Sequence, residues 1–215
     1  MPSVSRHPVP GPPRMTAAVR REQLLDVTMA IVVEQGFHAV SIQAVARNAG
    51  ISRPLVYEHF GDLDGLLEAL VGRVTSRALE QVSETTVEAL SAGDPTEQLL
   101  DSLGKYRHAV EHHPSTWQLV LMPPEGAPEL LRDSVARDRA RILNKLTRAV
   151  GPGLTLAEGD PDPELTARIL SALADEYARL LLTDPLRFAF ERLMVHARWY
   201  LDHFSPLAAP PRVER

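Results

Sequence analysis

The sequence predicts an all-α protein in which a three-helix head precedes a larger helical body, with about nine helices in total. Apolar residues recur at the three- and four-residue spacing of amphipathic helices through most of the chain. Capping residues, prolines and glycines interrupt this pattern at intervals typical of helix ends. No segment sustains the alternation of apolar and polar residues that indicates a β-strand. The chain has 215 residues, 44% of them hydrophobic, which is enough to bury a sizeable core.

The first fifteen residues, MPSVSRHPVPGPPRM, are rich in proline and contain no apolar run. We therefore expect 1–15 to be a disordered arm rather than a secretory signal. Arg6 and Arg14 belong either to a solvated tail or to an arm that reaches into a DNA groove, and the sequence leaves both interpretations open. A first helix is expected over about 16–35, with Gly36 as its stop. Its apolar stripe contains Leu24, Val27 and Ile31.

Residues 41–60, SIQAVARNAGISRPLVYEHF, predict two short helices joined by a tight turn. Ser41 and Ser52 are suitable N-caps for the two helices. Gly50 suits the left-handed backbone conformation that side chains with a β-carbon resist. Pro54 falls in the first turn of the second helix, where its missing amide hydrogen costs little. This is the pattern of a helix-turn-helix, whose second helix lies in the DNA major groove.

The helical pattern continues to about residue 204. Asp62 is expected to cap a fourth, long helix that extends to about Leu90. We expect Asp184 to cap the last helix and Pro185 to open it. Further helices are expected over about 96–112, after Pro114, and over 126–150, 163–183 and 185–204. We divide the chain into the arm, a head over 16–75, a body over 76–205 and a flexible tail over 206–215.

The landmarks around the helix-turn-helix point to one family. A basic pair, Arg20 and Arg21, lies near the start of the first helix, and Tyr57-x-His59-Phe60 ends the motif. The pattern over about 20–67 resembles the DNA-binding domain of the tetracycline-repressor (TetR) family. The resemblance implies a homodimer, joined through its last two helices, that presents two recognition helices to a palindromic double-stranded DNA operator at ~34–36 Å separation. It further implies a repressor released by a small-molecule effector, although an activator would show the same sequence features.

We expect a small set of side chains to meet DNA. Arg53 reads guanine through a forked contact or binds only phosphate, and both outcomes remain open. Leu55 is placed to touch a thymine methyl, and Gln43 a phosphate or an adenine edge. The resemblance assigns phosphate contacts to Tyr57 and His59. The full expected set is Ser41, Gln43, Arg47, Ser52, Arg53, Pro54, Leu55, Tyr57 and His59.

Two positions depart from the family pattern. Pro54 stands where a small residue, often glycine, is usual. Asp62-Leu63-Asp64 replaces a Ser-Lys-Glu series, so the lysine normally available for a phosphate is absent. We expect DNA affinity to be lower, or to depend more on Arg20, Arg21 and Arg47.

The resemblance implies an effector cavity in the body, but the family diverges too far there to transfer its residues. Tyr106, Trp117, Met122 and Tyr177 are candidates because they combine apolar bulk with polar or polarisable atoms. Each is also a candidate for ordinary core. An apolar or aromatic ligand is the guess that fits this composition.

The net charge of −5 is unevenly divided, with +2 over residues 1–60 and −7 over the rest. A mildly basic head on an acidic body suits DNA binding through the head. The chain has no cysteine, which excludes disulfides and thiolate metal sites. No stretch approaches the ~20 uninterrupted apolar residues of a membrane helix. We therefore expect a soluble, cytoplasmic protein without a membrane segment.

His108-Ala109-Val110-Glu111-His112 fits the H-x-x-E-H pattern of a zinc peptidase family. A catalytic zinc needs a third protein ligand, and the neighbouring His113 points elsewhere on a helix. We therefore expect no metal, no cofactor and no enzymatic activity. Two alternatives to the regulator remain: a helical ligand-binding or interaction protein that does not use its head, and a metal-dependent hydrolase built on this motif.

Overall fold

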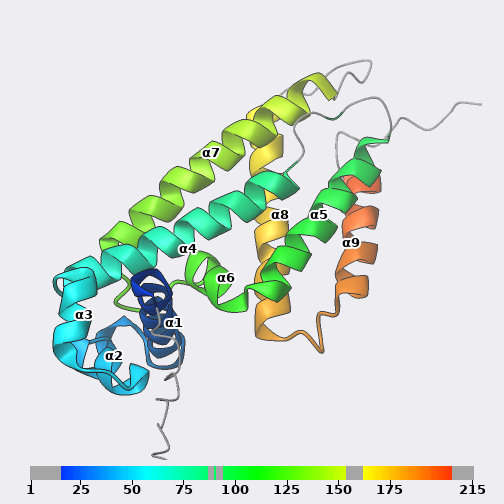
Figure 1. The fold of residues 1–215 in the computed structure, drawn as a ribbon. Helices are drawn as coiled ribbons and strands as arrows, with labels where there is room; N and C mark the ends of the chain where they lie inside the picture. The colour runs from blue at the N-terminus through cyan, green and yellow to red at the C-terminus, as the bar shows by residue number, and fades with distance from the viewer. Residues whose placement is uncertain (1–15, 87–89, 91–93, 154–161, 205–215) are drawn as a thin grey trace, which may run out of the picture.

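The computed structural model describes residues 16–86, 90, 94–153 and 162–204. Over these ranges it contains nine α-helices, one short 3-10 turn (Phe37–Ala39) and no strand, so the predicted all-α fold is confirmed (Figure 1). The helices are α1 (Ala17–Gln35), α2 (Ile42–Ala49), α3 (Arg53–Phe60), α4 (Leu63–Thr85), α5 (Pro95–His112), α6 (Pro114–Leu121), α7 (Glu129–Gly153), α8 (Pro163–Thr183) and α9 (Phe190–Phe204). None of the helices in the described part of the chain is both long and apolar enough to cross a bilayer.

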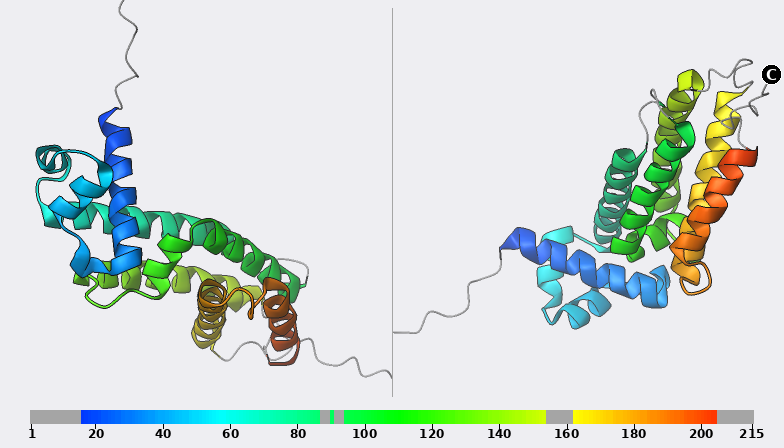
Figure 2. Two further views of the ribbon diagram at one scale, coloured as in Figure 1. Left: turned by 90° about the horizontal axis from the view of Figure 1, so that it is seen from below. Right: turned by 90° about the vertical axis from the view of Figure 1, so that its right-hand side faces the viewer.

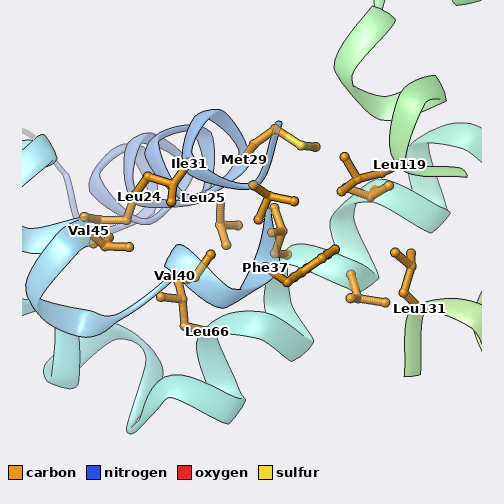
Figure 3. Close-up of a cluster of buried hydrophobic side chains, with 14 of the residues drawn as sticks. Leu24, Leu25, Met29, Ile31, Phe37, Val40, Val45, Leu66, Leu119 and Leu131 are labelled. Carbon is orange, nitrogen blue, oxygen red and sulfur yellow. The ribbon is translucent and has the colours of Figure 1, made fainter. Parts of the chain in front are cut away.

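The helices α1 to α3 form a head that closes over the first turns of α4 (Figure 3). Local signals in the sequence set its boundaries. Thr16 caps α1 by accepting a hydrogen bond from the Val19 amide (3.3 Å), and Gly36 ends it with a φ of +85°. The centre of the head is fully buried, with Leu24, Val45, Val56 and Leu66 all at 0% exposure.

The core of the head does not stop at the head. Leu119 of α6 and Leu131 of α7 belong to the same buried cluster and are labelled beside Phe37 in Figure 3. The elements α4, α6 and α7 therefore connect the head to the rest of the molecule through shared apolar packing.

The body is a set of long helices that lies beside and beyond the head (Figures 1 and 2). α4 and α7 pack side by side, α8 packs on α7, and α5 contacts α4, α8 and α9. In both views of Figure 2 the head occupies one end, while α8 and α9 lie away from it.

Three expected boundaries differ from the structure. α4 ends at Thr85 rather than near Leu90, because the Thr85 and Thr86 hydroxyls both donate to the Val82 carbonyl (3.0 and 2.7 Å) and Thr86 is extended. α7 begins at Glu129, just after a proline, and not at residue 126.

The third difference concerns the start of the last helix. α9 begins at Phe190 and not at Pro185. The Asp184 carboxylate accepts a hydrogen bond from the Arg187 amide (3.0 Å), and the Asp184 carbonyl accepts one from the Phe188 amide (3.0 Å). Asp184 thus caps an isolated turn rather than the helix. The expected arm over 1–15 and tail over 206–215 lie outside the described residues.

Candidate DNA-binding surface and ligand cavity

The helix α3 lies on the outside of the head, with one side turned inward. Val56 is fully buried against the head core, whereas Arg53 and Pro54 are exposed and Tyr57 is half exposed (50%). Gly50, at φ +67°, makes the turn from α2, and the Ile51 amide donates to the Ala46 carbonyl (3.0 Å). This turn orients α3 so that its polar side faces solvent.

The helix α2 presents two polar side chains beside α3. Ser41 caps α2 by accepting a hydrogen bond from the Ala44 amide (3.1 Å). Gln43 and Arg47, four residues apart and therefore on the same side of the helix, are both exposed. Neither the Arg47 nor the Arg53 side chain makes a hydrogen bond or ion pair within the described residues, so both guanidinium groups are free to bind an anionic partner.

Ser52 does not cap α3 through its side chain, contrary to our expectation. The second residue of the helix is Pro54, which has no amide hydrogen, and the Leu55 amide donates to the Ser52 carbonyl instead (3.2 Å). The Ser52 side chain is consequently exposed and uncommitted. Leu55 is half-buried and so faces outward only in part.

The C-terminal end of α3 is tied to α1 by Arg21. The Arg21 guanidinium donates to the carbonyl of His59 (2.9 Å) and lies over the ring of Phe60, 4.4 Å from its centroid. His59 and Phe60 are both half-buried. Arg21 therefore positions the recognition helix and is less available to phosphate than the sequence suggested.

The start of α4 lies next to α3 and carries two acids. Asp62 accepts a hydrogen bond from the Gly65 amide (2.8 Å), and Asp64 is exposed in the first turn. The partial positive charge at the helix N-terminus stabilises both carboxylates. The same two negative charges repel a phosphate brought close to this end of α4. A β-carbon at Gly65 would collide with the carbonyl of Phe60, so the α3–α4 corner requires glycine, which the sequence analysis missed.

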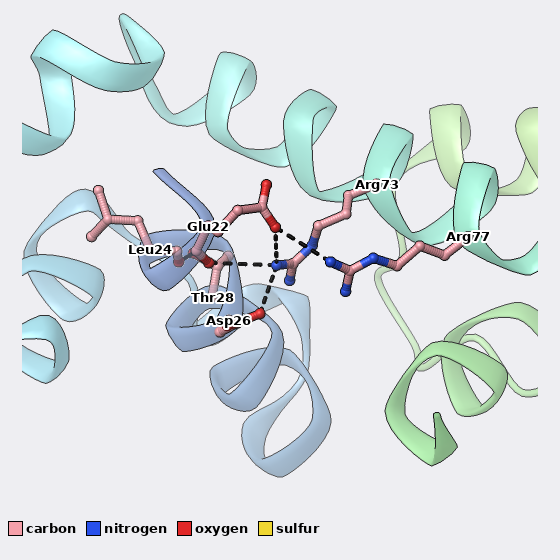
Figure 4. Close-up of polar contacts among 6 residues, drawn as sticks. All are labelled: Glu22, Leu24, Asp26, Thr28, Arg73 and Arg77. Atoms are coloured by element: carbon pink, nitrogen blue, oxygen red, sulfur yellow. Dashed lines mark hydrogen bonds and ion pairs between the residues drawn. The ribbon is translucent and has the colours of Figure 1, made fainter. Parts of the chain in front are cut away.

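A second feature missed from the sequence is an ionic cluster between α1 and α4, which we call the α1–α4 clamp: Glu22, Asp26, Arg73 and Arg77 (Figure 4). Arg73 binds Asp26 (2.6 Å) and Glu22 (3.2 Å), and Arg77 binds Glu22 (3.4 Å). The signal was present, because two acids four residues apart on one helix match two arginines four residues apart on another.

The body contains a cavity of about 180 Å³ lined by residues of α4 to α9. Tyr106 and Trp117 line it, with their rings edge to face at a centroid distance of 4.9 Å. The Trp117 indole donates to the Gln81 side chain on α4 (3.0 Å). Most of the remaining wall is aliphatic, including Val82, Leu99, Leu103, Ile142, Leu146 and Leu170.

The other two expected lining residues lie elsewhere. Met122 is the C-cap of α6 and does not line the cavity. The Tyr177 hydroxyl lies 2.6 Å from Nδ1 of His196 on α9, on a different side of α8. Burial raises the pKa of Tyr177 to about 12. Both residues were chosen for their apolar bulk and their polar or polarisable atoms. Neither property shows whether the side chain faces the cavity.

One part of the cavity wall is charged. Arg139 of α7 forms an ion pair with Asp175 of α8, and the Tyr106 hydroxyl donates to the same carboxylate (3.4 Å). Asp138 also lines the cavity and pairs with Arg141 (3.0 Å). Burial raises the pKa of Tyr106, so this hydroxyl remains a donor at neutral pH.

The helix α6 touches both the cavity and the head. Trp117, Val120 and Leu121 line the cavity, while Leu119, on the opposite side of the helix, is 2% exposed in the head core. The helix α6 therefore joins the wall of the cavity to the core of the head.

The H-x-x-E-H motif lies on the exposed end of α5. The rings of His108 and His112 lie 3.8 Å apart, and Nδ1 of His112 is 2.8 Å from the His108 carbonyl. Glu111 is paired with Arg107 (3.0 Å). Within the part of the chain that the structure describes, no three or more metal-binding side chains gather in one place.

Comparison with known proteins identifies the head. Residues 24–70 match the sequence family described as bacterial regulatory proteins, tetR family. The HTH-type transcriptional regulator BetI of Yersinia pestis (strain Pestoides F) is 41% identical over 81 residues, which are 38% of this chain and 40% of BetI. The chain thus matches well under half the length of these curated relatives.

Solved structures extend the likeness to most of the chain. A tetR-family transcriptional regulator from Streptomyces coelicolor is 27% identical, with a TM-score of 0.61 over 89% of this chain and 83% of that one. A protein from Saccharomonospora viridis, solved in complex with choline, shares the fold at 20% identity, with a TM-score of 0.64 over 87% and 97% of the two chains. Residues 24–70 thus match the TetR family of bacterial regulatory proteins, and the chain as a whole shares the fold of solved proteins described as regulators of that family.

Proposed function

We propose that this protein is a transcriptional repressor that binds a palindromic DNA operator as a homodimer and leaves it when a small molecule fills the cavity. The observation that carries the proposal is the surface formed by α2 and α3. Arg47, Arg53 and the half-exposed Tyr57 stand on one helix-turn-helix, and the two arginines lack partners in the described part of the chain. Such a group binds phosphates and base edges.

The expected DNA contacts divide into two groups under this proposal. Gln43, Arg47, Ser52, Arg53 and Tyr57 are exposed and approach the duplex directly. Ser41, Leu55 and His59 are half-buried and contribute mainly by holding the motif in shape. Pro54 sets the first turn of α3.

The dimer is proposed to form through α8 and α9. Each helix exposes two apolar side chains four residues apart: Leu165 (53%) and Ile169 (45%) on α8, and Val195 (72%) and Trp199 (48%) on α9. Pairs at this spacing form a stripe that a second helix can cover. Covering these stripes with a second subunit removes them from water, and a twofold axis presents two α3 helices to one face of DNA.

Release requires that the ligand favour a DNA-incompetent arrangement by ~1–3 kcal/mol of coupling. α6 is suited to carry that coupling, because it lines the cavity on one side and the head core on the other. The Saccharomonospora viridis protein of the same fold was solved with a small molecule, choline, which supports a ligand-binding body.

The test is selection from a pool of random duplex DNA at about 150 mM salt, a physiological ionic strength. One enriched palindromic site is expected, and its binding should be lost with Arg53→Ala but kept with Arg148→Ala, an exposed arginine on α7 far from α3. Salt-sensitive binding with no enriched sequence would contradict the proposal and favour a ligand-binding protein that does not use its head. An empty pool would be repeated with candidate ligands present, since a corepressor gives the same first result.

A further inference from the structure

The charges that line the cavity are unequal in number. Two carboxylates, Asp138 and Asp175, face one guanidinium, Arg139, so the wall carries a net charge of −1. The wall therefore favours a positively charged ligand group over a negatively charged one, provided that one of the two carboxylates is available to bind it.

Arg139 is not available to an anionic ligand. It is ion-paired with Asp175, whose side chain is 14% exposed and also accepts the Tyr106 hydroxyl. An anion that took over Arg139, whose own side chain is 45% exposed, would leave the largely buried Asp175 carboxylate without its counter-charge, which is unfavourable. The anion would also lie near Asp138, a like charge.

Asp138, by contrast, is available to a cation. Its side chain is 21% exposed, and its partner Arg141 is 68% exposed and does not line the cavity. Such a pair contributes little, because water screens it and the arginine side chain is mobile in solvent. A ligand ammonium inside the cavity exchanges this weak contact for a charge-assisted hydrogen bond in a less solvated place.

The rest of the wall specifies the shape of such a ligand. The rings of Tyr106 and Trp117 line the same cavity, and aromatic faces attract organic cations. The aliphatic wall suits a hydrocarbon arm. The cavity measures about 180 Å³, and since an apolar cavity of about 150 Å³ holds one benzene, a ligand of roughly six to ten non-hydrogen atoms fits.

We propose that the cavity binds a small organic cation, an amine with an aromatic or aliphatic arm, whose nitrogen lies at Asp138. This proposal rests on the proposed function, because it takes the cavity to be the effector site. The binding itself is independent of DNA and is tested without it.

Isothermal titration calorimetry on the full-length protein, with three probes of nearly equal size, tests the charge preference. Phenethylamine is expected to bind at least tenfold more tightly than phenethyl alcohol, and phenylacetate more weakly than either. Asp138→Asn should remove the preference for the amine over the alcohol while leaving the affinity for the alcohol unchanged. Asp133→Asn, an exposed aspartate on α7 that does not line the cavity, is the matched control and should change neither.

The proposal is wrong if phenylacetate binds as tightly as phenethylamine, if no probe binds, or if Asp138→Asn keeps the amine preference. The wild-type comparison of the three probes holds even where the variant fails to fold. If the amine binds but leaves DNA affinity unchanged, the ligand class stands and the release step of the proposed function fails.

Discussion

Replacing Arg73 by glutamine should lower the free energy of unfolding by about 1 kcal/mol. Arg73 makes two ion pairs in the α1–α4 clamp, at 2.6 and 3.2 Å, and its own side chain is 9% exposed. Its partners Asp26 and Glu22 are 70% and 52% exposed, so both acids return to water when the arginine is removed. Pairs with exposed partners contribute ~0.2–1 kcal/mol each, which gives about 1 kcal/mol for two.

Arg73→Ala should cost more, about 2.5 kcal/mol, because it also removes two buried methylenes worth ~0.8 kcal/mol each. The Nε atom of Arg73 is buried without a hydrogen-bond partner in the described residues, so losing this one atom adds no lost hydrogen bond to the cost of Arg73→Ala. Arg77→Gln is the matched control. Its side chain is 47% exposed and makes one pair at 3.4 Å, so its cost should stay below about 0.5 kcal/mol.

Urea denaturation followed by circular dichroism measures all three losses, at one protein concentration because the proposed dimer would make stability concentration-dependent. In 1 M salt, where the screening length is ~3 Å, the Arg73→Gln loss should shrink by about half, whereas most of the additional Arg73→Ala loss should remain. Equal losses for Arg73→Gln and Arg77→Gln would show that the clamp does not depend on Arg73.

Four further outcomes are expected. Arg53→Ala should weaken binding to the selected operator by ~1–3 kcal/mol if it reads a base; in fluorescence anisotropy, loss of a phosphate contact instead lowers the salt slope by ~0.9 and affects all sequences alike. Asp64→Lys should strengthen DNA binding and raise the salt slope by ~0.9, because it returns a cation to the start of α4; an unchanged slope would place α4 away from the phosphates. Val195→Glu should yield a monomer in sedimentation analysis, while Val19→Glu, at an exposed valine on α1, should leave the dimer intact; two dimers would exclude α9 from the interface. The raised pKa of Tyr177, about 12 in the folded protein, means that the unfolded chain loses its proton first, so the urea midpoint should fall as pH rises from about 10 to 12. Tyr177→Phe should make that fall smaller, and an identical fall would exclude Tyr177 as a cause.

The sequence predicted those features that depend on near neighbours in the chain. Gly50 and the cap at Ser41 follow from the conformational preferences of single residues, and both appear in the structure. Ser52 does not cap α3 with its side chain. The preference of serine for the N-cap and the preference of proline for the first turn meet at the same helix start, where Pro54 removes an amide. Asp184 failed similarly, since a capping residue does not determine whether one turn or a whole helix follows it.

Features that depend on packing between helices could not be predicted from the sequence. Tyr106 and Tyr177 occupy similar apolar stripes, yet only Tyr106 lines the cavity described above, because the rotation of each helix is set by its neighbours. Gly65 is required because a β-carbon there would collide with the carbonyl of Phe60. The contact lies across the corner between α3 and α4, and the apolar periodicity of the sequence does not describe the geometry of that corner. The expected DNA contacts all belong to one short, locally encoded motif, so their places on α2 and α3 could be read from the sequence, while their contact with DNA stays a prediction.

The shared packing at α6 has a consequence for engineering this protein. A boundary near residue 75 cuts through α4, one continuous helix, and separates Leu119 and Leu131 from the core they complete. A chimaera joined at that point would place the head on a foreign support and leave Phe37 and its neighbours partly uncovered. Transferring the head to another helical body therefore requires carrying over α6 and the first turns of α7, so the smallest transferable unit includes part of the body.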